Sequence, residues 1–336
     1  MSVVFLGDIH SGMKNDDEWY HENLYTVLKQ CVDYCKEHGI DTIVQSGDFF
    51  DVRKATTQTT MNFVRERVVP LLDGLHMIVL VGNHDCQYKD TIQPNAPREV
   101  LSKYPCFTVI DEPKTMKIAG VDFDLIPWIA EKNAASIFDF IARSKSKFCM
   151  GHFELAGYYF YKNSKADHGL ESDFLRKYDR VYSGHYHHAN DGGNVHYIGT
   201  PLTMTANDED EVRGFYEFNG TEELKFIPNP NCHHKKILYP LNADVDTSLF
   251  KNCAVRLFIE SVDDKLDKFQ TAIEKIAYSV DVKNNIKNDS DISDDFEIET
   301  VSALFDRYID GMNHTPEDKA DIKNYVTSLY NEASSQ

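Results

Sequence analysis

The chain has 336 residues, which exceeds the usual size of one domain and favours one large domain with smaller modules. Its hydrophobic content of 42% is enough for a sizeable core, yet no run of eighteen apolar residues occurs, which argues against a membrane-spanning helix. The net charge of −19 argues against a protein that holds nucleic acid by charge alone. Seven scattered cysteines without a C-x-x-C pair indicate reduced thiols, and residues 2–7 resemble a strand and not a signal peptide. We therefore expect a cytoplasmic protein.

The first half of the chain alternates between strand and helix patterns. Apolar runs at 3–6, 42–45 and 77–81 predict buried strands, and apolar residues at helical spacing predict helices over 19–36 and 57–72. This alternation indicates βαβ units and a mainly parallel sheet. Further strands are predicted near 107–110, 114–118, 123–126, 148–150, 180–183, 195–198 and 214–218.

From about residue 228 the composition changes. Strands near 236–239 and 254–259 precede an amphipathic helix that carries Val262, Leu266, Phe269, Ile273, Ile276 and Val280. Residues 282–297 are rich in Asn, Asp and Ser, which is typical of a linker, and two short amphipathic helices follow. The predicted domains are therefore 1–228, a small αβ domain at 229–281, a linker at 282–297 and a helical pair at 298–336.

Five segments share one arrangement, in which an apolar strand is followed by a small residue and then by residues that bind metals. They are Gly7-Asp8-Ile9-His10, Gly47-Asp48, Gly82-Asn83-His84-Asp85, Gly151-His152 and Gly184-His185-Tyr186-His187. Ligands bind beyond the carboxyl ends of the strands in open α/β sheets, so we expect the five segments to meet at one edge. Glycine before each ligand would let the backbone turn sharply there.

The segments supply seven candidate metal ligands: Asp8, His10, Asp48, Asn83, His152, His185 and His187. One ion cannot use seven protein ligands and still bind a substrate, whereas two ions can if one carboxylate bridges them. Nitrogen and oxygen ligands without thiolate favour Mn, Fe or Zn. Two such ions can activate a water and stabilise both oxygens of a displacement at phosphorus, which predicts a phosphoesterase.

With these five motifs, residues 1–220 resemble the calcineurin-like metallophosphoesterases. The resemblance implies an α/β (α+β) fold, a four-layer sandwich of two sheets flanked by helices, here followed by a small αβ capping domain and a C-terminal helical pair. It also implies that Asp8, His10 and His187 bind one metal. Asn83, His152 and His185 would bind the other, with Asp48 bridging. His84 matches the family's catalytic histidine, which protonates the leaving oxygen or steadies phosphoryl charge, and Asp85 would orient it.

The surroundings of the motifs are similar to those of SbcD-type DNA repair nucleases. The matching segments are Asp48–Asp51 running into Val52-Arg53-Lys54, Gly199-Thr200-Pro201 and Arg213-Gly214-Phe215. The layout looks closest to the shorter versions of T-even-like phages, which serve as recombination nuclease subunits in the host cytoplasm. This resemblance implies a double-strand exonuclease of 3′ to 5′ polarity and a single-strand endonuclease, acting in DNA repair, recombination and replication.

The same resemblance implies cofactors and partners. Two Mn²⁺ ions are expected, with Mg²⁺ or other divalent ions as options, and a homodimer would assemble with an SbcC-type coiled-coil ABC ATPase into a heterotetramer. The helices at 298–336 would bind that ATPase. The last 56 residues hold thirteen acidic and five basic residues, so much of the negative charge would face the ATPase and not DNA. Candidate DNA contacts are Lys14, Arg53, Lys54 and Lys89.

Two other functions stay open from the sequence. One is a stand-alone phosphatase or small-nucleotide phosphodiesterase of the same superfamily. The other is a mainly structural clamp subunit that regulates the ATPase.

Overall fold

The computed structural model describes residues 2–162, 164–221 and 223–286, and near the C-terminus residues 309, 315, 319, 320, 322, 323, 325 and 326. Residues 1–285 form one compact unit and residues 286–336 a second. The helices predicted over 298–336 and most of the linker predicted at 282–297 lie outside the described residues. Among the described residues, no helix has the length and apolar character that crossing a membrane requires.

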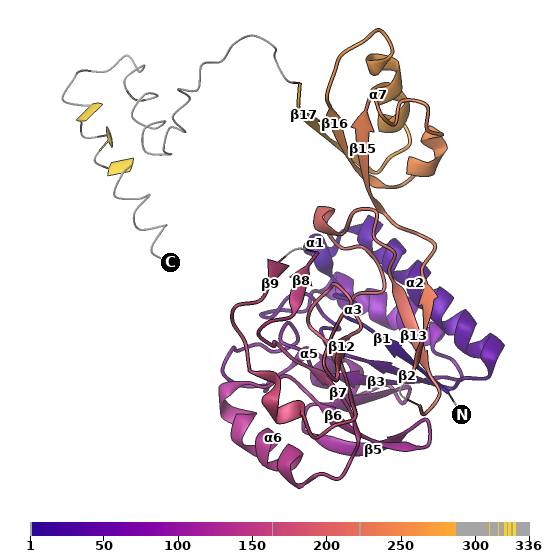
Figure 1. Ribbon diagram of the computed structural model, residues 1–336, viewed down its shortest axis with the longest axis vertical. Helices are drawn as coiled ribbons and strands as arrows, with labels where there is room; N and C mark the ends of the chain where they lie inside the picture. The colour runs from indigo at the N-terminus through magenta and orange to yellow at the C-terminus, as the bar shows by residue number, and fades with distance from the viewer. Residues whose placement is uncertain are drawn as a thin grey trace. The chain divides into compact units, whose positions relative to one another are not determined.

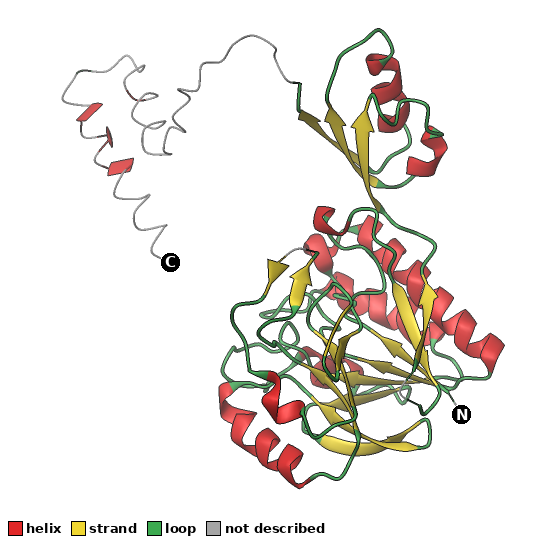
Figure 2. Ribbon diagram, viewed as in Figure 1, coloured by secondary structure: helices red, strands yellow, loops and turns green. Residues whose placement is uncertain are grey.

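Two mixed sheets of six strands form the centre of the first unit (Figures 1 and 2). The first has the order β14-β13-β1-β2-β3-β4, with β1 to β4 parallel and β13 antiparallel to β1. Its strands are β1 (Val3–Leu6), β2 (Thr42–Gln45), β3 (His76–Leu80), β4 (Phe107–Ile110), β13 (Gly214–Phe218) and β14 (Leu224–Pro228).

The second sheet has the order β11-β12-β10-β7-β6-β5, and its four inner strands are parallel. Its strands are β5 (Lys114–Ile118), β6 (Val121–Ile126), β7 (Phe148–His152), β10 (Arg180–Gly184), β11 (Asn190–Gly192) and β12 (Val195–Tyr197). The sequence predicted all but β11 and β14 of these twelve strands. Both of these are edge strands with partly exposed residues, so they lack the continuous apolar run of a buried strand.

The helices of this region are α1 (Met13–Asp16), α2 (Glu18–His38), α3 (Gln58–Phe63), the π-helical turn Val64–Val68, α4 (Val69–Leu71), α5 (Ala96–Leu101) and α6 (Glu131–Arg143). Short 3₁₀ turns lie at Ser172–Leu175 and Ala206–Asp208, and a two-stranded hairpin consists of β8 (Tyr159–Tyr161) and β9 (Ser164–Lys165). Asp17 caps α2 by accepting from the backbone N–H groups of Trp19 and Tyr20, and Gly39 ends this helix in a left-handed conformation.

Three apolar cores give the sandwich its four layers. The middle core joins the facing sides of the two sheets, where Phe5 and Val44 of the first sheet pack with Leu125 of the second. A second core joins the other side of the first sheet to helices, including α2, and a third joins the second sheet to α6. The predicted α/β sandwich of two sheets flanked by helices is confirmed.

A smaller sheet lies in the segment after β14. It contains β15 (His234–Tyr239), β16 (Ala254–Ile259) and β17 (Ser279–Asn284), all parallel, and it packs against α7 (Leu266–Glu274) with a 3₁₀ turn at Thr247–Phe250. The helix is shorter than predicted, because Val280 lies in β17 and not on α7. Alternating Val280 and Val282 suit a strand that is apolar on one face, a period-2 pattern that a helical interpretation misses.

Candidate metal centre

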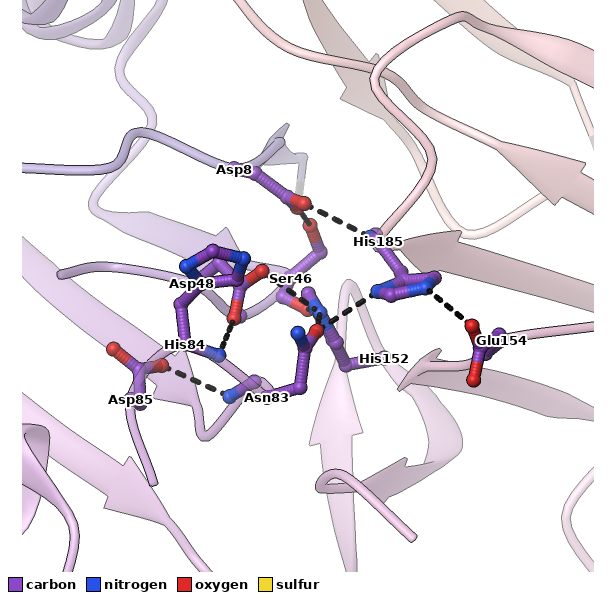
Figure 3. Close-up of polar contacts among 12 residues, drawn as sticks. Asp8, Ser46, Asp48, Asn83, His84, Asp85, His152, Glu154 and His185 are labelled. Atoms are coloured by element: carbon purple, nitrogen blue, oxygen red, sulfur yellow. Dashed lines mark hydrogen bonds and ion pairs between the residues drawn. The ribbon is translucent and has the colours of Figure 1, made fainter. Parts of the chain in front are cut away.

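The five predicted segments meet where strands β1, β2, β3, β7 and β10 end, and Asp48 lies in the middle of them (Figure 3). Its Oδ1 accepts a 2.7 Å hydrogen bond from the backbone N–H of His84. Its Oδ2 lies 3.8 Å from Nε2 of His10 and 3.3 Å from Nε2 of His152. One carboxylate oxygen is therefore shared by two groups of potential ligands.

The first group consists of Asp8, His10 and His187, whose donor atoms lie within 4.8 Å of one another. The Nε2 atoms of His10 and His187 are 3.1 Å apart. Asp8 is held by Ser46 Oγ, which donates to its Oδ1 at 3.1 Å, and by the backbone N–H of His185, which donates to its Oδ2 at 2.9 Å. A carboxylate and two imidazoles that converge in this way could hold one divalent ion with Asp48.

The second group consists of Asn83, His152 and His185. Asn83 Oδ1 lies 3.0 Å from Nε2 of His152 and 2.8 Å from Nδ1 of His185. Nδ1 of His152 lies 2.9 Å from the carbonyl oxygen of Ser46, so in the neutral ring this nitrogen carries the proton and the lone pair of Nε2 faces the centre. On His185, Nε2 lies 3.8 Å from Oε1 of Glu154, which leaves Nδ1 facing the centre. Histidines that bind metals are commonly held through the other ring nitrogen in this way.

The side-chain amide of Asn83 can take two orientations, one that suits a metal-bound centre and one that suits a metal-free centre. With Oδ1 toward the two histidines, three lone-pair-bearing atoms converge, an arrangement that a cation between them would stabilise. With the amide turned over, its NH₂ group would donate to His152 and His185, and its oxygen would accept from Nη2 of Arg53 at 3.0 Å. The donor set of the first orientation fits a divalent ion, because all of its atoms are oxygen or imidazole nitrogen.

Burial and charge shift the pKa values of these groups in opposite directions. Burial raises the pKa of Asp8, whereas His152 and His10 hold the pKa of Asp48 far below its usual range despite its burial. Burial opposes the charged form of His152, but Asp48 and Asp8 raise its pKa to about 9. Burial, and then the charge of His10, lower the pKa of His187. Without a metal, the centre therefore binds protons where a divalent ion would bind instead.

Asp51 contacts two histidines of the centre. Its Oδ1 lies 3.2 Å from Nδ1 of His10, and its backbone oxygen lies 2.7 Å from Nδ1 of His84. The second contact places a proton on Nδ1 of His84 and leaves Nε2 free to donate or accept another. The His10 and His84 rings meet edge to face, with centroids 4.8 Å apart. Asp51 lies three residues after Asp48, and its contacts with both rings could not be predicted from the sequence.

The predicted role of Asp85 needs correction. Its carboxylate accepts from the backbone N–H groups of Gly82 and Phe50, both at 2.9 Å, and from that of Phe49 at 3.3 Å. Asp85 therefore joins the loops of the second and third motifs, and the group that orients the His84 ring is the carbonyl of Asp51. Burial, and then the charge of Asp48, raise the pKa of Asp85 to about 7.

The glycines before the ligands serve mainly to leave space. A Cβ on Gly82 would lie 2.2 Å from Oδ1 of Asp48, and one on Gly184 would lie 2.4 Å from Oδ1 of Asp8. Of the five glycines, Gly47 alone has a positive φ, of 112°. The left-handed conformation occurs instead at three candidate ligands, with φ of 43° at His10, 53° at Asp48 and 85° at His185. Such strained backbone clusters at functional sites.

Of the four predicted DNA contacts, Arg53 lies at the centre, next to the Asn83 amide. Lys14 is exposed and its Nζ lies 5.3 Å from the centroid of the Trp19 ring, while Lys54 and Lys89 are exposed.

Arg213, which lies in the segment Arg213-Gly214-Phe215, supports the fifth motif. Its side chain is 6% exposed, and Nη2 pairs with Asp208 at 2.8 Å and with Glu211 at 2.5 Å. Its Nη1 donates to the backbone oxygen of His187 and, at 3.1 Å, to Oγ1 of Thr200. A buried arginine thus holds the backbone that carries a candidate ligand.

Comparison with known proteins agrees with this geometry. Residues 1–189 match the model of the calcineurin-like phosphoesterase family. The chain is 44% identical to exonuclease subunit 1 of Enterobacteria phage T4 over 338 residues, which cover 99% of both chains. It is also 22% identical over 227 residues to the DNA double-strand break repair protein Mre11 of Sulfurisphaera tokodaii, covering 63% of this chain and 56% of that protein. A third relative, Mre11 of Saccharolobus solfataricus, is 24% identical over 132 residues, which cover 38% of this chain and 34% of that protein.

The predicted resemblance is confirmed: the chain belongs to the calcineurin-like phosphoesterase family.

Proposed function

We propose that this chain is a two-metal phosphodiesterase that cleaves DNA. The observation that carries the proposal is the position of Oδ2 of Asp48, which lies 3.8 Å from Nε2 of His10 and 3.3 Å from Nε2 of His152. In this proposal Asp48 would help to hold two ions. Asp8, His10 and His187 would hold one of them, and Asn83, His152 and His185 would hold the other.

Hydrolysis requires a bond to form between a water oxygen and phosphorus and the bond from phosphorus to the leaving oxygen to break. Two divalent ions held there would supply an activated water and would neutralise charge on the phosphodiester. The leaving oxygen needs a proton, and His84 in its cationic form can donate one from Nε2 while its Nδ1–H stays with the carbonyl of Asp51. The backbone N–H of His84 also holds Oδ1 of Asp48, so the proton donor and the bridging carboxylate share one short segment.

DNA is the proposed substrate because the relatives named above are an exonuclease subunit and DNA double-strand break repair proteins. The similarity to the T4 subunit covers 99% of the chain and therefore includes the segments beyond the metal centre. Following the resemblance seen in the sequence, we propose exonuclease activity on double strands from 3′ to 5′ and endonuclease activity on single strands. From the same resemblance we propose Mn²⁺ as the metal, which a set of nitrogen and oxygen ligands suits.

We further propose that the chain dimerises and works with an SbcC-type ABC ATPase. The net charge of −19 is consistent with weak, salt-sensitive DNA binding by the chain alone, so the ATPase would provide most of the affinity. Deleting residues 296–336 should abolish association with the ATPase and spare metal-dependent hydrolysis of a small phosphodiester. Loss of both would contradict the assignment of this segment to the ATPase.

One experiment separates the three candidate functions. The chain is purified alone and with its ATPase, Mn²⁺ is added, and cleavage of an end-labelled DNA duplex is followed beside hydrolysis of a chromogenic phosphomonoester. The proposal predicts DNA cleavage that exceeds phosphomonoester hydrolysis and increases with the ATPase. Phosphomonoester hydrolysis without DNA cleavage would indicate a phosphatase, and absence of both activities would indicate a structural subunit.

A further inference from the structure

A small cavity lies beside the second ligand group. Its volume is about 170 Å³, and its wall includes His152, which is itself a candidate ligand. The rest of the wall is mainly apolar and includes Trp128, Ile129, Phe153 and Leu170. The cavity is smaller than the roughly 300–1,000 Å³ of most ligand pockets, so it suits a single planar ring system and not a larger molecule.

Trp128 is fixed in the wall of this cavity through its backbone. Its N–H donates to the carbonyl of Val81 at 2.8 Å, and its carbonyl accepts from the side chain of Asn133 at 3.0 Å. Val81 directly precedes the third motif, so Trp128 is held next to the segment that carries Asn83. The indole ring contacts the second ligand group directly, since its centroid lies 5.4 Å from that of His185.

The indole N–H of Trp128 is available to a ligand. Within the described part of the chain its N–H has no hydrogen-bond acceptor, whereas the N–H of Trp19 donates to the backbone oxygen of Asn252 at 2.8 Å. Trp128 is half-buried, and it packs at the edge of the core behind the first sheet. A half-buried indole that lines a cavity beside the candidate metal centre is a suitable partner for stacking.

We propose that this cavity binds one nucleobase of the DNA strand, stacked on Trp128, next to the phosphodiester that is cleaved. The inference rests on the proposed function, because His152 both belongs to the second ligand group and lines the cavity, so a phosphate bound at that group would have its nucleoside within reach of the cavity. Stacking of a base on an aromatic side chain depends little on base identity, because every base has a π-face. The cavity therefore positions the strand without selecting a sequence.

Intrinsic fluorescence tests the proposal directly, because the chain has two tryptophans. In a Trp19→Phe background Trp128 is the sole tryptophan. With Mg²⁺ present, a deoxynucleoside 5′-monophosphate should change its fluorescence saturably, whereas 2-deoxyribose 5-phosphate, which lacks the base, should not. Equal responses to both compounds, or no response to a mononucleotide that inhibits hydrolysis, would overturn the proposal.

A cleavage assay that compares the wild type with two Trp128 variants gives a second test. Single-stranded substrates carry an abasic residue on either the 5′ or the 3′ side of the scissile bond. The wild type should cleave one of them about 5- to 150-fold more slowly than the intact strand, which is the range for one stacked base. Trp128→Ala should remove this difference, Trp128→Phe should keep most of it, and both variants should bind Mn²⁺ as the wild type does by calorimetry.

Base binding would be contradicted if Trp128→Ala still cleaved the abasic strand more slowly than the intact strand by the wild-type factor. It would also be contradicted if the wild type cleaved both abasic strands as fast as the intact strand. Failure of the wild type to cleave any DNA would instead contradict the proposed function, and the mononucleotide titration would still decide whether the cavity binds a base.

Discussion

The carboxylate oxygen Oδ2 of Asp48 lies 3.3 Å from Nε2 of His152, at a point where the side chains of two separate sheets meet. The same oxygen faces His10. Because Oδ1 is held by the backbone N–H of His84, the carboxylate cannot rotate freely, and Oδ2 is presented to both ligand groups.

Asp48→Asn should therefore weaken the binding of both metal ions together. We expect the affinity for Mn²⁺, measured by titration calorimetry, to fall by more than about 100-fold, the upper limit for loss of a group that only supports a ligand. Asp124→Asn is a matched control, since Asp124 is also buried and accepts hydrogen bonds from Thr115 and Tyr178. Loss of one ion with the other bound at full affinity would contradict a bridging role.

His84→Ala should keep both metal ions and lose DNA cleavage. General acid catalysis typically contributes about 10²- to 10⁴-fold, so we expect a decrease of that size in kcat for DNA. A nitrophenyl phosphodiester has a leaving oxygen that needs little protonation, so its hydrolysis should decrease much less. Equal losses with both substrates would contradict proton donation by His84.

Arg213→Met should destabilise the protein strongly. The substitution leaves the buried Asp208 without its ion-pair partner, whereas Glu211 keeps Lys162 and His188 nearby, each at 3.4 Å. Breaking a buried ion pair costs about 3–5 kcal/mol. Arg176→Met is the control, because the side chains of Arg176 and Asp173 are 76% and 67% exposed and such a pair contributes less than about 1 kcal/mol. Urea unfolding of the metal-free protein measures both losses, and equal values would contradict this account of Arg213.

His234 should make the protein sensitive to acid. Burial, and then the charge of Lys14, lower its pKa to about 4, and Nδ1 lies 3.0 Å from Oγ1 of Thr203. Between pH 4 and about 6.5 the unfolded chain binds a proton that the folded chain does not, so stability decreases as pH falls through this range. The loss is roughly 3 kcal/mol for a shift of this size.

His234→Asn should remove that part of the pH dependence. The comparison uses urea unfolding at pH 7 and pH 4.5, with a chelator present so that metal binding does not contribute. If the variant and the wild type lost the same stability on acidification, the buried neutral state of His234 would be wrong.

The sequence was sufficient to predict most of the fold and the convergence of the motifs. The strands β1, β2 and β3 are mainly apolar and end no more than one residue before Gly-Asp or Gly-Asn, and this pattern places the ligand residues at the carboxyl ends. Strand β17 was missed because Val280 fits both a helical stripe and a strand alternation. Short segments of this kind have no period long enough to decide between the two.

Side-chain contacts between residues that are distant in sequence could not be predicted. The carbonyl of Asp51 holds the His84 ring, and Asp85 binds backbone amides of the second motif, although His84 and Asp85 are neighbours in sequence. The need for glycine at positions 82 and 184 could not be predicted either. It depends on the side chains of Asp48 and Asp8, which follow other strands and fill the space beside these glycines. These relationships exist only once the two sheets have packed together.

The number of metal ions that the chain binds tests directly whether it is a two-metal enzyme. The wild-type protein, first stripped of metal, is titrated with Mn²⁺ by calorimetry, and cleavage of an end-labelled duplex is measured along the same titration. We expect two ions per chain and DNA cleavage that appears only as the second ion binds. Full cleavage with a single ion bound, or in the presence of a chelator, would contradict it.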